Sequence, residues 1–173
     1  MIFNNKVLIV DNFFDNFDNI QDEFKKINLY NIDEFKKKYG GDLNYPGKRS
    51  DILKKSSPFL FNLILKELSH KIGKFFDENN YFTSINSFIH LRLEKEQDWI
   101  HTDPAKITMI VYLSETNFNS GTAFYDEKDN LISESKYIKN RAVLFDGKMK
   151  HSSINNFGTD INNGRLTLNT FFE

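Results

Sequence analysis

Residues 84–93 read SINSFIHLRL, and apolar and polar side chains alternate along this stretch. Successive side chains of a strand point to opposite faces of a sheet, so Ile89 and Leu91 would share one face and His90 and Arg92 the other. The same period of two continues toward the end of the chain. We therefore expect further short strands at 99–101, 107–114, 120–125, 131–138, 142–146, 149–154 and 165–172. Eight short strands behind a helical segment favour a sandwich or barrel of the jelly-roll type.

Two of these strands repeat the two-faced pattern. In the strand at 165–172, two leucines share one face and Arg165 and Thr167 share the other; in the strand at 107–114, Tyr112 lies on the mixed face. Such mixed faces can simply meet solvent. We favour the alternative that they line the mouth of a barrel, with the apolar faces beneath the N-terminal helices. The reason is the arginine, because this lysine-rich chain contains only four arginines.

The first third of the chain predicts helices. A short buried strand at 7–10 precedes a helix that Asp15 would cap. A second helical stretch at 33–39 ends at two glycines, and residues 40–57 are expected to form a long loop. Ser57-Pro58 then opens a further helix. Its apolar positions are Phe61, Leu65, Leu68, Ile72, Phe75 and Phe76, and His70 lies off this stripe and should be exposed.

Length and composition limit the class of protein. The chain has 173 residues, a net charge of −1, 39% hydrophobic and 27% charged residues. These values suit one globular domain over 1–173, with a helical support and loop at 1–80 and a jelly-roll core at 81–173. The near-zero charge gives no signal for nucleic acid or an anionic membrane surface. The early apolar run is too short for a signal peptide or a membrane span, so we expect a soluble cytoplasmic protein.

The absence of cysteine restricts any metal site to His, Asp and Glu ligands. His101 and Asp103 stand two residues apart, so on an extended segment both point to the same side. Pro104 keeps Asp103 extended. His151 opens a later expected strand, and two imidazoles with one carboxylate form the facial triad of non-haem Fe(II) sites. Taken singly, His101 could equally be a turn histidine and His151 a hydrogen-bonded histidine at a strand end.

Arg165 follows His151 by fourteen residues and could hold a carboxylate as a planar fork, assisted by Thr167 on the same face. With this residue in place, the order of motifs resembles the Fe(II)/2-oxoglutarate-dependent oxygenases, and most of all their prolyl-4-hydroxylase-like branch. The motifs are His101-Thr102-Asp103, Tyr112-Leu113-Ser114, Gly121-Thr122-Ala123-Phe124, His151 and Arg165-Leu166-Thr167.

The resemblance implies a double-stranded β-helix in which His101, Asp103 and His151 bind Fe(II). It implies that 2-oxoglutarate chelates the iron through its 2-oxo acid end and that O2 is the second co-substrate. The far carboxylate of 2-oxoglutarate would meet Arg165, helped by Tyr112 and Thr167. Because Asp103 is present, the resemblance implies hydroxylation and not halogenation.

The substrate is a small molecule or a peptide that the sequence does not identify. Three residues are candidates for contacting it: Trp99 at the entrance, Arg92 beside His90, and Arg49 in the 40–57 loop. The alternatives are a core tryptophan, a cross-strand pairing role and a plain surface arginine. Two other functions stay open, namely a cupin-like metal-dependent isomerase or hydrolase without 2-oxoglutarate and a non-catalytic jelly-roll binding module.

Overall fold

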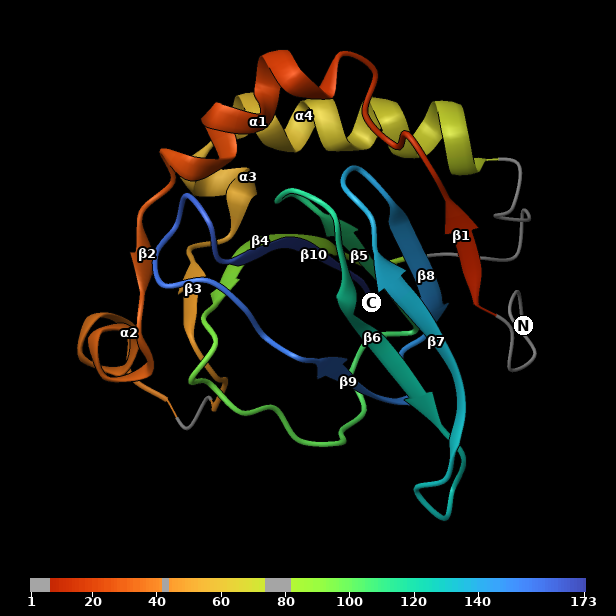
Figure 1. Cartoon of the computed structure of the whole chain (residues 1–173). Coiled ribbons are helices and arrows are strands. Elements are labelled where there is room, and N and C mark those ends of the chain that lie inside the picture. Colours follow the sequence, from red (N-terminus) through yellow and green to blue (C-terminus); the bar gives the residue numbers. More distant parts are fainter. Residues whose placement is uncertain (1–6, 42–43, 74–81) are drawn as a thin grey trace.

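The computed structural model describes residues 7–41, 44–73 and 82–173, and the chain folds into two antiparallel sheets that face each other (Figure 1). The larger sheet has the order β1 (Leu8–Val10), β8 (Ala142–Asp146), β5 (Ile107–Tyr112), β10 (Arg165–Phe172), β4 (Ile85–Arg92), β3 (Lys48–Ser50) and β2 (Leu29–Tyr30). The smaller sheet has the order β7 (Leu131–Tyr137), β6 (Asn117–Tyr125) and β9 (Lys150–Ile154). The expectation of a mainly β, double-stranded β-helix with N-terminal helices is confirmed.

Most of the helices cover the outer face of the larger sheet, while the second one lies beside β2 at the edge of that sheet (Figure 1). The helices are α1 (Phe17–Lys25), α2 (Ile32–Tyr39), α3 (Leu53–Ser56) and α4 (Pro58–Glu67), and α4 continues into a π-helical turn, η1 (Leu68–Ile72). Phe24 of α1 and Ile64 of α4 are fully buried against Ile89, Leu144 and Leu168 of the sheet. In Figure 1, α1 and α4 cross the same side of the strands. No helix among the described residues is long and apolar enough to cross a membrane.

Strand parity assigns the faces of the larger sheet correctly. Leu91 and Leu166 belong to the core beneath the helices. Their neighbours Arg92, Arg165 and Thr167 point the other way and line a pocket between the two sheets. The interpretation that the mixed faces line the mouth of the barrel is therefore confirmed, and solvent exposure of those faces is excluded by their burial.

The expected strand at 99–101 is wrong. Only an isolated bridge joins His101 to His151. The segment then reaches Pro104, which has no N–H to donate to a ladder, and the side chains of Trp99 and Ile100 are exposed. The pairing thus stops after one residue pair, although that pair is enough to fix His101.

The 40–57 region is more ordered than expected, since it contains β3 and α3.

The N-termini of the helices also differ from the sequence expectations. The residue before α1 is Asn16, in a left-handed conformation without a side-chain cap, so Asp15 does not cap this helix. Pro58 does open α4, but Ser57 makes no side-chain capping bond. His70 is exposed as expected, and Phe75 and Phe76 lie outside the described residues.

Candidate active site

A pocket of about 400 Å³ lies between the two sheets and collects most of the predicted functional residues. Its walls come from β3, β4 and β10 of the larger sheet, β9 of the smaller sheet and the segment before β5. Eight of the nine residues predicted from the sequence line it: Arg49, Arg92, Trp99, His101, Asp103, His151, Arg165 and Thr167. The ninth, Tyr112, lies behind the wall.

The three predicted metal ligands converge. The ligand atoms of His101, Asp103 and His151 all lie within 4.8 Å of one another, and the Nε2 of His151 is 3.4 Å from the Oδ2 of Asp103. Backbone pairing sets this geometry, because His101 and His151 exchange two N–H···O bonds of 3.0 and 2.9 Å. The Asp103 N–H donates to the carbonyl of Gly147 at 2.7 Å, which holds the carboxylate beside the imidazoles.

Hydrogen bonds orient each ligand. The Nδ1 of His101 donates to the Trp99 carbonyl at 2.8 Å, and the Nδ1 of His151 donates to the Met149 carbonyl at 2.9 Å. Both Nε2 atoms therefore keep a free lone pair directed at the common point. Thr108 donates to the Oδ2 of Asp103 at 2.7 Å.

Burial also lowers the pKa of His151, although Asp103 partly opposes this effect, so the imidazole is neutral and competent as a ligand. Two imidazoles and one carboxylate are a donor set that suits Fe(II) and leaves positions for other ligands.

Arg165 is a buried cation without a carboxylate partner among the described residues. Arg165 is only 3% exposed. Its Nη2 donates to the Gly121 carbonyl at 3.1 Å, and its Nε has no hydrogen-bond partner within the described ranges. Burial lowers the pKa of Arg165, and the neighbouring Arg92 adds to this effect. A buried guanidinium whose N–H groups are not all hydrogen-bonded is suited to bind an anion that enters the pocket. On the same strand face, Thr167 donates to the Oδ1 of Asn169 at 2.8 Å.

Tyr112 has partners inside the protein. The residue is fully buried, and its hydroxyl donates to the Oγ1 of Thr122 at 2.9 Å, with the Ser135 carbonyl at 3.3 Å. Burial raises the pKa of Tyr112. Its ring lies 5.9 Å from the guanidinium carbon of Arg165. A direct contact of this hydroxyl with a co-substrate stays a prediction, whereas Thr122 itself lines the pocket.

Replacing Tyr112 with phenylalanine should lower the free energy of unfolding by about 1 kcal/mol, because a buried intramolecular hydrogen bond is lost. Affinity for 2-oxoglutarate should fall only a few-fold, through the loss of Thr122 orientation. Denaturant titration and a binding titration on the same variant measure the two effects. A large loss of affinity with unchanged stability would instead place the hydroxyl on the co-substrate.

Asp98 is the site residue that the sequence reasoning missed. It forms an ion pair with Arg92 and accepts the Ser153 N–H at 2.7 Å, while Arg92 donates to the Ser153 Oγ at 3.0 Å. Burial alone would raise the pKa of Asp98, but Arg92 and the Ser153 N–H outweigh it and the pKa is lowered. Arg92 thus ties the segment before His101 to β9 through an ion pair with a loop residue, which differs from the cross-strand pairing considered for it.

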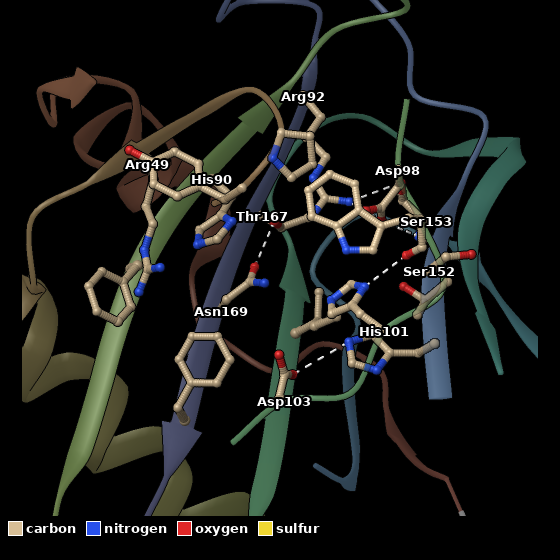
Figure 2. A pocket seen from close by; sticks show the side chains of 18 of the residues that line it. Arg49, His90, Arg92, Asp98, His101, Asp103, Ser152, Ser153, Thr167 and Asn169 are labelled. Carbon is tan, nitrogen blue, oxygen red and sulfur yellow. Dashed lines mark hydrogen bonds and ion pairs between the residues drawn. The ribbon is translucent and has the colours of Figure 1, made fainter. Parts of the chain in front are cut away.

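The two other candidates from the sequence take different places. Trp99 is 45% exposed at the rim of the pocket, so it is not a core tryptophan. Arg49 is not a plain surface arginine, since its guanidinium carbon lies 3.6 Å from the centre of the Phe88 ring inside the pocket wall. Figure 2 shows Thr167 and Asn169 between Arg49 and the His101–Asp103 pair in that view.

His90 is 6% exposed and lines the same wall. Neither ring nitrogen has a hydrogen-bond partner in the part of the chain that the structure describes. Burial lowers the pKa of His90 well below 6.5, and Arg49, Arg92 and Arg165 lower it further, so the folded protein holds this imidazole neutral.

This buried histidine predicts acid sensitivity. Above the unfolded pKa of about 6.5, His90 is neutral in both states and contributes no pH dependence. As the pH falls below 6.5, His90 becomes protonated in the unfolded chain but stays neutral in the folded protein. The free energy of unfolding should therefore fall by up to about 1.4 kcal/mol per pH unit. Denaturation of metal-free protein between about pH 5 and 6.5 measures this slope. In the His90→Gln variant the free energy of unfolding should depend less steeply on pH, and the remaining dependence comes from His151. A pH dependence equal to that of the wild type would contradict a neutral, buried His90.

Comparison with known proteins addresses the fold. No protein-family model and no curated protein matches the sequence. Among solved structures, a prolyl hydroxylase from Trichoplax adhaerens in complex with a hypoxia inducible factor peptide fragment matches with a TM-score of 0.66 at 13% identity, over 98% of this chain and 84% of that one. An oxidoreductase of the 2OG-Fe(II) oxygenase family from Burkholderia pseudomallei matches with a TM-score of 0.71 at 11% identity, over 96% and 84%.

A third structure, HygX from Streptomyces hygroscopicus with nickel and 2-oxoglutarate bound, matches with a TM-score of 0.64 at 10% identity, over 96% of this chain and 82% of that one. At such identities the likeness establishes the architecture. The chain has the double-stranded β-helix fold found in these 2-oxoglutarate oxygenases, and the triad of His101, Asp103 and His151 lies in the pocket of that fold.

Proposed function

We propose that the protein is an Fe(II)/2-oxoglutarate-dependent oxygenase that hydroxylates a small-molecule or peptide substrate. The observation that carries the proposal is the convergence of His101, Asp103 and His151 in the same pocket as the buried, incompletely paired Arg165. The likeness to structures of 2-oxoglutarate oxygenases supports it. One of those proteins is described as a prolyl hydroxylase with a peptide, and another as holding nickel and 2-oxoglutarate.

Bound Fe(II) and 2-oxoglutarate would supply the oxidising chemistry, in which conversion of 2-oxoglutarate to succinate and CO2 activates O2 to place one oxygen atom in a substrate C–H bond. The residues of the chain position the reactants. His101, Asp103 and His151 would occupy one face of the ion and leave the opposite positions open. Arg165 would hold the far carboxylate as a charge-assisted pair. The Arg92–Asp98 pair keeps the segment that carries His101 in place.

The two other functions make different demands on the pocket. A cupin-like isomerase or hydrolase would use the same three ligands, but without 2-oxoglutarate it would not provide the carboxylate that Arg165 is suited to bind. A non-catalytic binding module would not need convergence of the three ligands, nor both histidines held with Nε2 free. The oxygenase accounts for the triad and the arginine together.

The decisive experiment measures conversion of 2-oxoglutarate to succinate by the purified protein with Fe(II) and O2, with no other substrate added. We expect slow turnover that requires Fe(II) and stops on anaerobic incubation. Calorimetry with Ni(II) in place of iron should show 2-oxoglutarate binding only in the presence of metal. Metal binding without any affinity for 2-oxoglutarate would favour the cupin-like alternative, and absence of both would favour the binding module.

A further inference from the structure

Arg49 has no part in the proposed co-substrate chemistry, yet its half-buried side chain lies in the pocket wall. Within the described part of the chain it forms no hydrogen bond and no ion pair, and its Nε is buried without a partner. The guanidinium carbon lies 3.6 Å from the centroid of the Phe88 ring and 5.7 Å from that of the Tyr45 ring. A cation–π contact of this kind leaves the N–H groups of the fork available to bind an anion.

The strand register places Arg49 next to His90 and away from Arg165. Arg49 pairs with His90 across β3 and β4, and His90 pairs with Thr167 across β4 and β10. Two strand spacings, about 10 Å, therefore separate the backbone of Arg49 from that of Thr167. Arg165 lies two residues farther along β10, so the two guanidinium groups belong to different corners of one pocket.

The nitrogen atoms that lack partners form a pattern. Among the described residues that line the pocket, His90 has two such atoms and Arg49, Arg92 and Arg165 have one each; His90 and Arg49 are also cross-strand neighbours. Buried polar groups are normally satisfied, so the unpartnered Nε–H of Arg49 and the one imidazole N–H of neutral His90 indicate a ligand that supplies acceptors. A structural arginine would have a carboxylate partner here, as Arg92 has in Asp98.

We propose that Arg49 and His90 form a binding subsite for a carboxylate group of the prime substrate, distinct from the corner where Arg165 meets 2-oxoglutarate. This inference rests on the proposed function. 2-Oxoglutarate has two carboxylates, and the metal and Arg165 account for both of them. A third anion site is then available to the substrate.

Charge favours a carboxylate over a phosphate. Burial lowers the pKa of Arg49 to about 10, so it remains a cation at neutral pH. His90 is neutral in the folded protein, so the subsite offers one full positive charge and one imidazole N–H. A planar monoanion matches a single fork, whereas a dianionic phosphate would be left undercompensated in a buried site.

The test uses protein loaded with Ni(II) and saturated with 2-oxoglutarate, so that the metal and Arg165 are already occupied. The probes are acetate, benzoate and N-acetylglycine, each paired with its neutral amide, together with inorganic phosphate. Calorimetry at constant ionic strength gives the dissociation constants. We expect at least one carboxylate to bind tenfold or more tightly than its amide, and phosphate to bind more weakly than that carboxylate.

In the Arg49→Gln variant the preference for carboxylate over amide should fall to about twofold or less, and Arg49→Lys should retain part of it because lysine keeps the charge without the fork. Arg141→Gln is the matched control, because Arg141 pairs with Asp11 outside the pocket. This variant should leave the preference for carboxylate over amide unchanged. The melting temperature of Arg49→Gln should fall by no more than about 4 °C, because the contact with Phe88 is lost but no hydrogen bond or ion pair among the described residues is broken; a structural arginine would lower it further.

Several outcomes overturn the subsite. These are equal binding of all carboxylates and amides by the wild type, tighter binding of phosphate, or a preference that survives Arg49→Gln. A tenfold loss of 2-oxoglutarate affinity in Arg49→Gln would make Arg49 a co-substrate residue and also overturn it. Failure of the proposed function looks different: no 2-oxoglutarate binds and no succinate forms in the wild type, whatever the probes do.

Discussion

Replacing His151 with alanine should abolish Fe(II) binding in the pocket and, with it, conversion of 2-oxoglutarate to succinate. His151 supplies one of three ligands whose donor atoms lie within 4.8 Å of one another. Loss of a group that merely supports a metal ligand costs roughly 10- to 100-fold in affinity, so loss of a ligand itself should exceed about 100-fold. Titration of the metal-free protein with Fe(II) under anaerobic conditions measures this change.

Folding has to be separated from metal binding in this variant, because His151 is buried and its ring lies 4.6 Å from that of Phe145. The His151→Gln variant fills more of the space and should keep a melting temperature closer to that of the wild type. It should lose iron affinity all the same, because an amide is a poor ligand compared with imidazole. Retention of tight iron binding by both variants would refute the assignment of the triad.

His70→Ala is the matched control. Asp15, Glu67 and His70 form a second group of metal-ligating side chains among the described residues. In that group Asp15 is already paired with Lys71 at 2.8 Å, which opposes binding of a cation. His70→Ala should therefore leave iron binding and turnover unchanged, and a loss of iron in that variant alone would move the metal to the helical side of the molecule.

Much of the pocket could be predicted from local patterns. Strand alternation assigned Arg165 and Thr167 to one face of β10, and that face lines the pocket. The i, i+2 spacing of His101 and Asp103 brought two ligands together without knowledge of the fold. Such predictions succeed because the side-chain period of a strand is a property of the backbone and does not depend on which strands become neighbours.

The features of the pocket that the sequence did not predict depend on contacts between segments far apart in the chain. Nothing local marks Asp98 as the partner of Arg92, because a charged loop residue usually meets solvent. Lys48–Ser50 carries no strand signal in a stretch with Gly and Pro, and it becomes β3 because its backbone pairs with β2 and β4. That pairing turns Arg49 into a residue of the pocket wall. Tertiary pairing thus overrides local propensity where it completes a sheet.

Replacing Arg165 with alanine should weaken 2-oxoglutarate binding by at least tenfold while iron stays bound. Truncating one partner of a buried charge pair costs on the order of 2–5 kcal/mol, and among the described residues the guanidinium makes one hydrogen bond, at 3.1 Å to the Gly121 carbonyl. Arg165→Lys should also be impaired, because an ammonium cannot reproduce the planar fork. Calorimetry with Ni(II)-loaded protein gives the co-substrate affinity, and a separate titration gives the metal affinity.

The decisive comparison sets Arg165→Ala beside Arg49→Gln and the Arg141→Gln control. Arg165 is buried and Arg49 is half-buried; neither has a carboxylate partner among the described residues, and they lie at different corners of one pocket. If Arg165 holds the far carboxylate, its loss alone reduces 2-oxoglutarate affinity. If affinity survives in Arg165→Ala and falls in Arg49→Gln, the co-substrate lies across the pocket toward β3, and the roles of the two arginines are exchanged. Because iron affinity should be equal in all three variants, any difference in 2-oxoglutarate binding reports on the carboxylate alone.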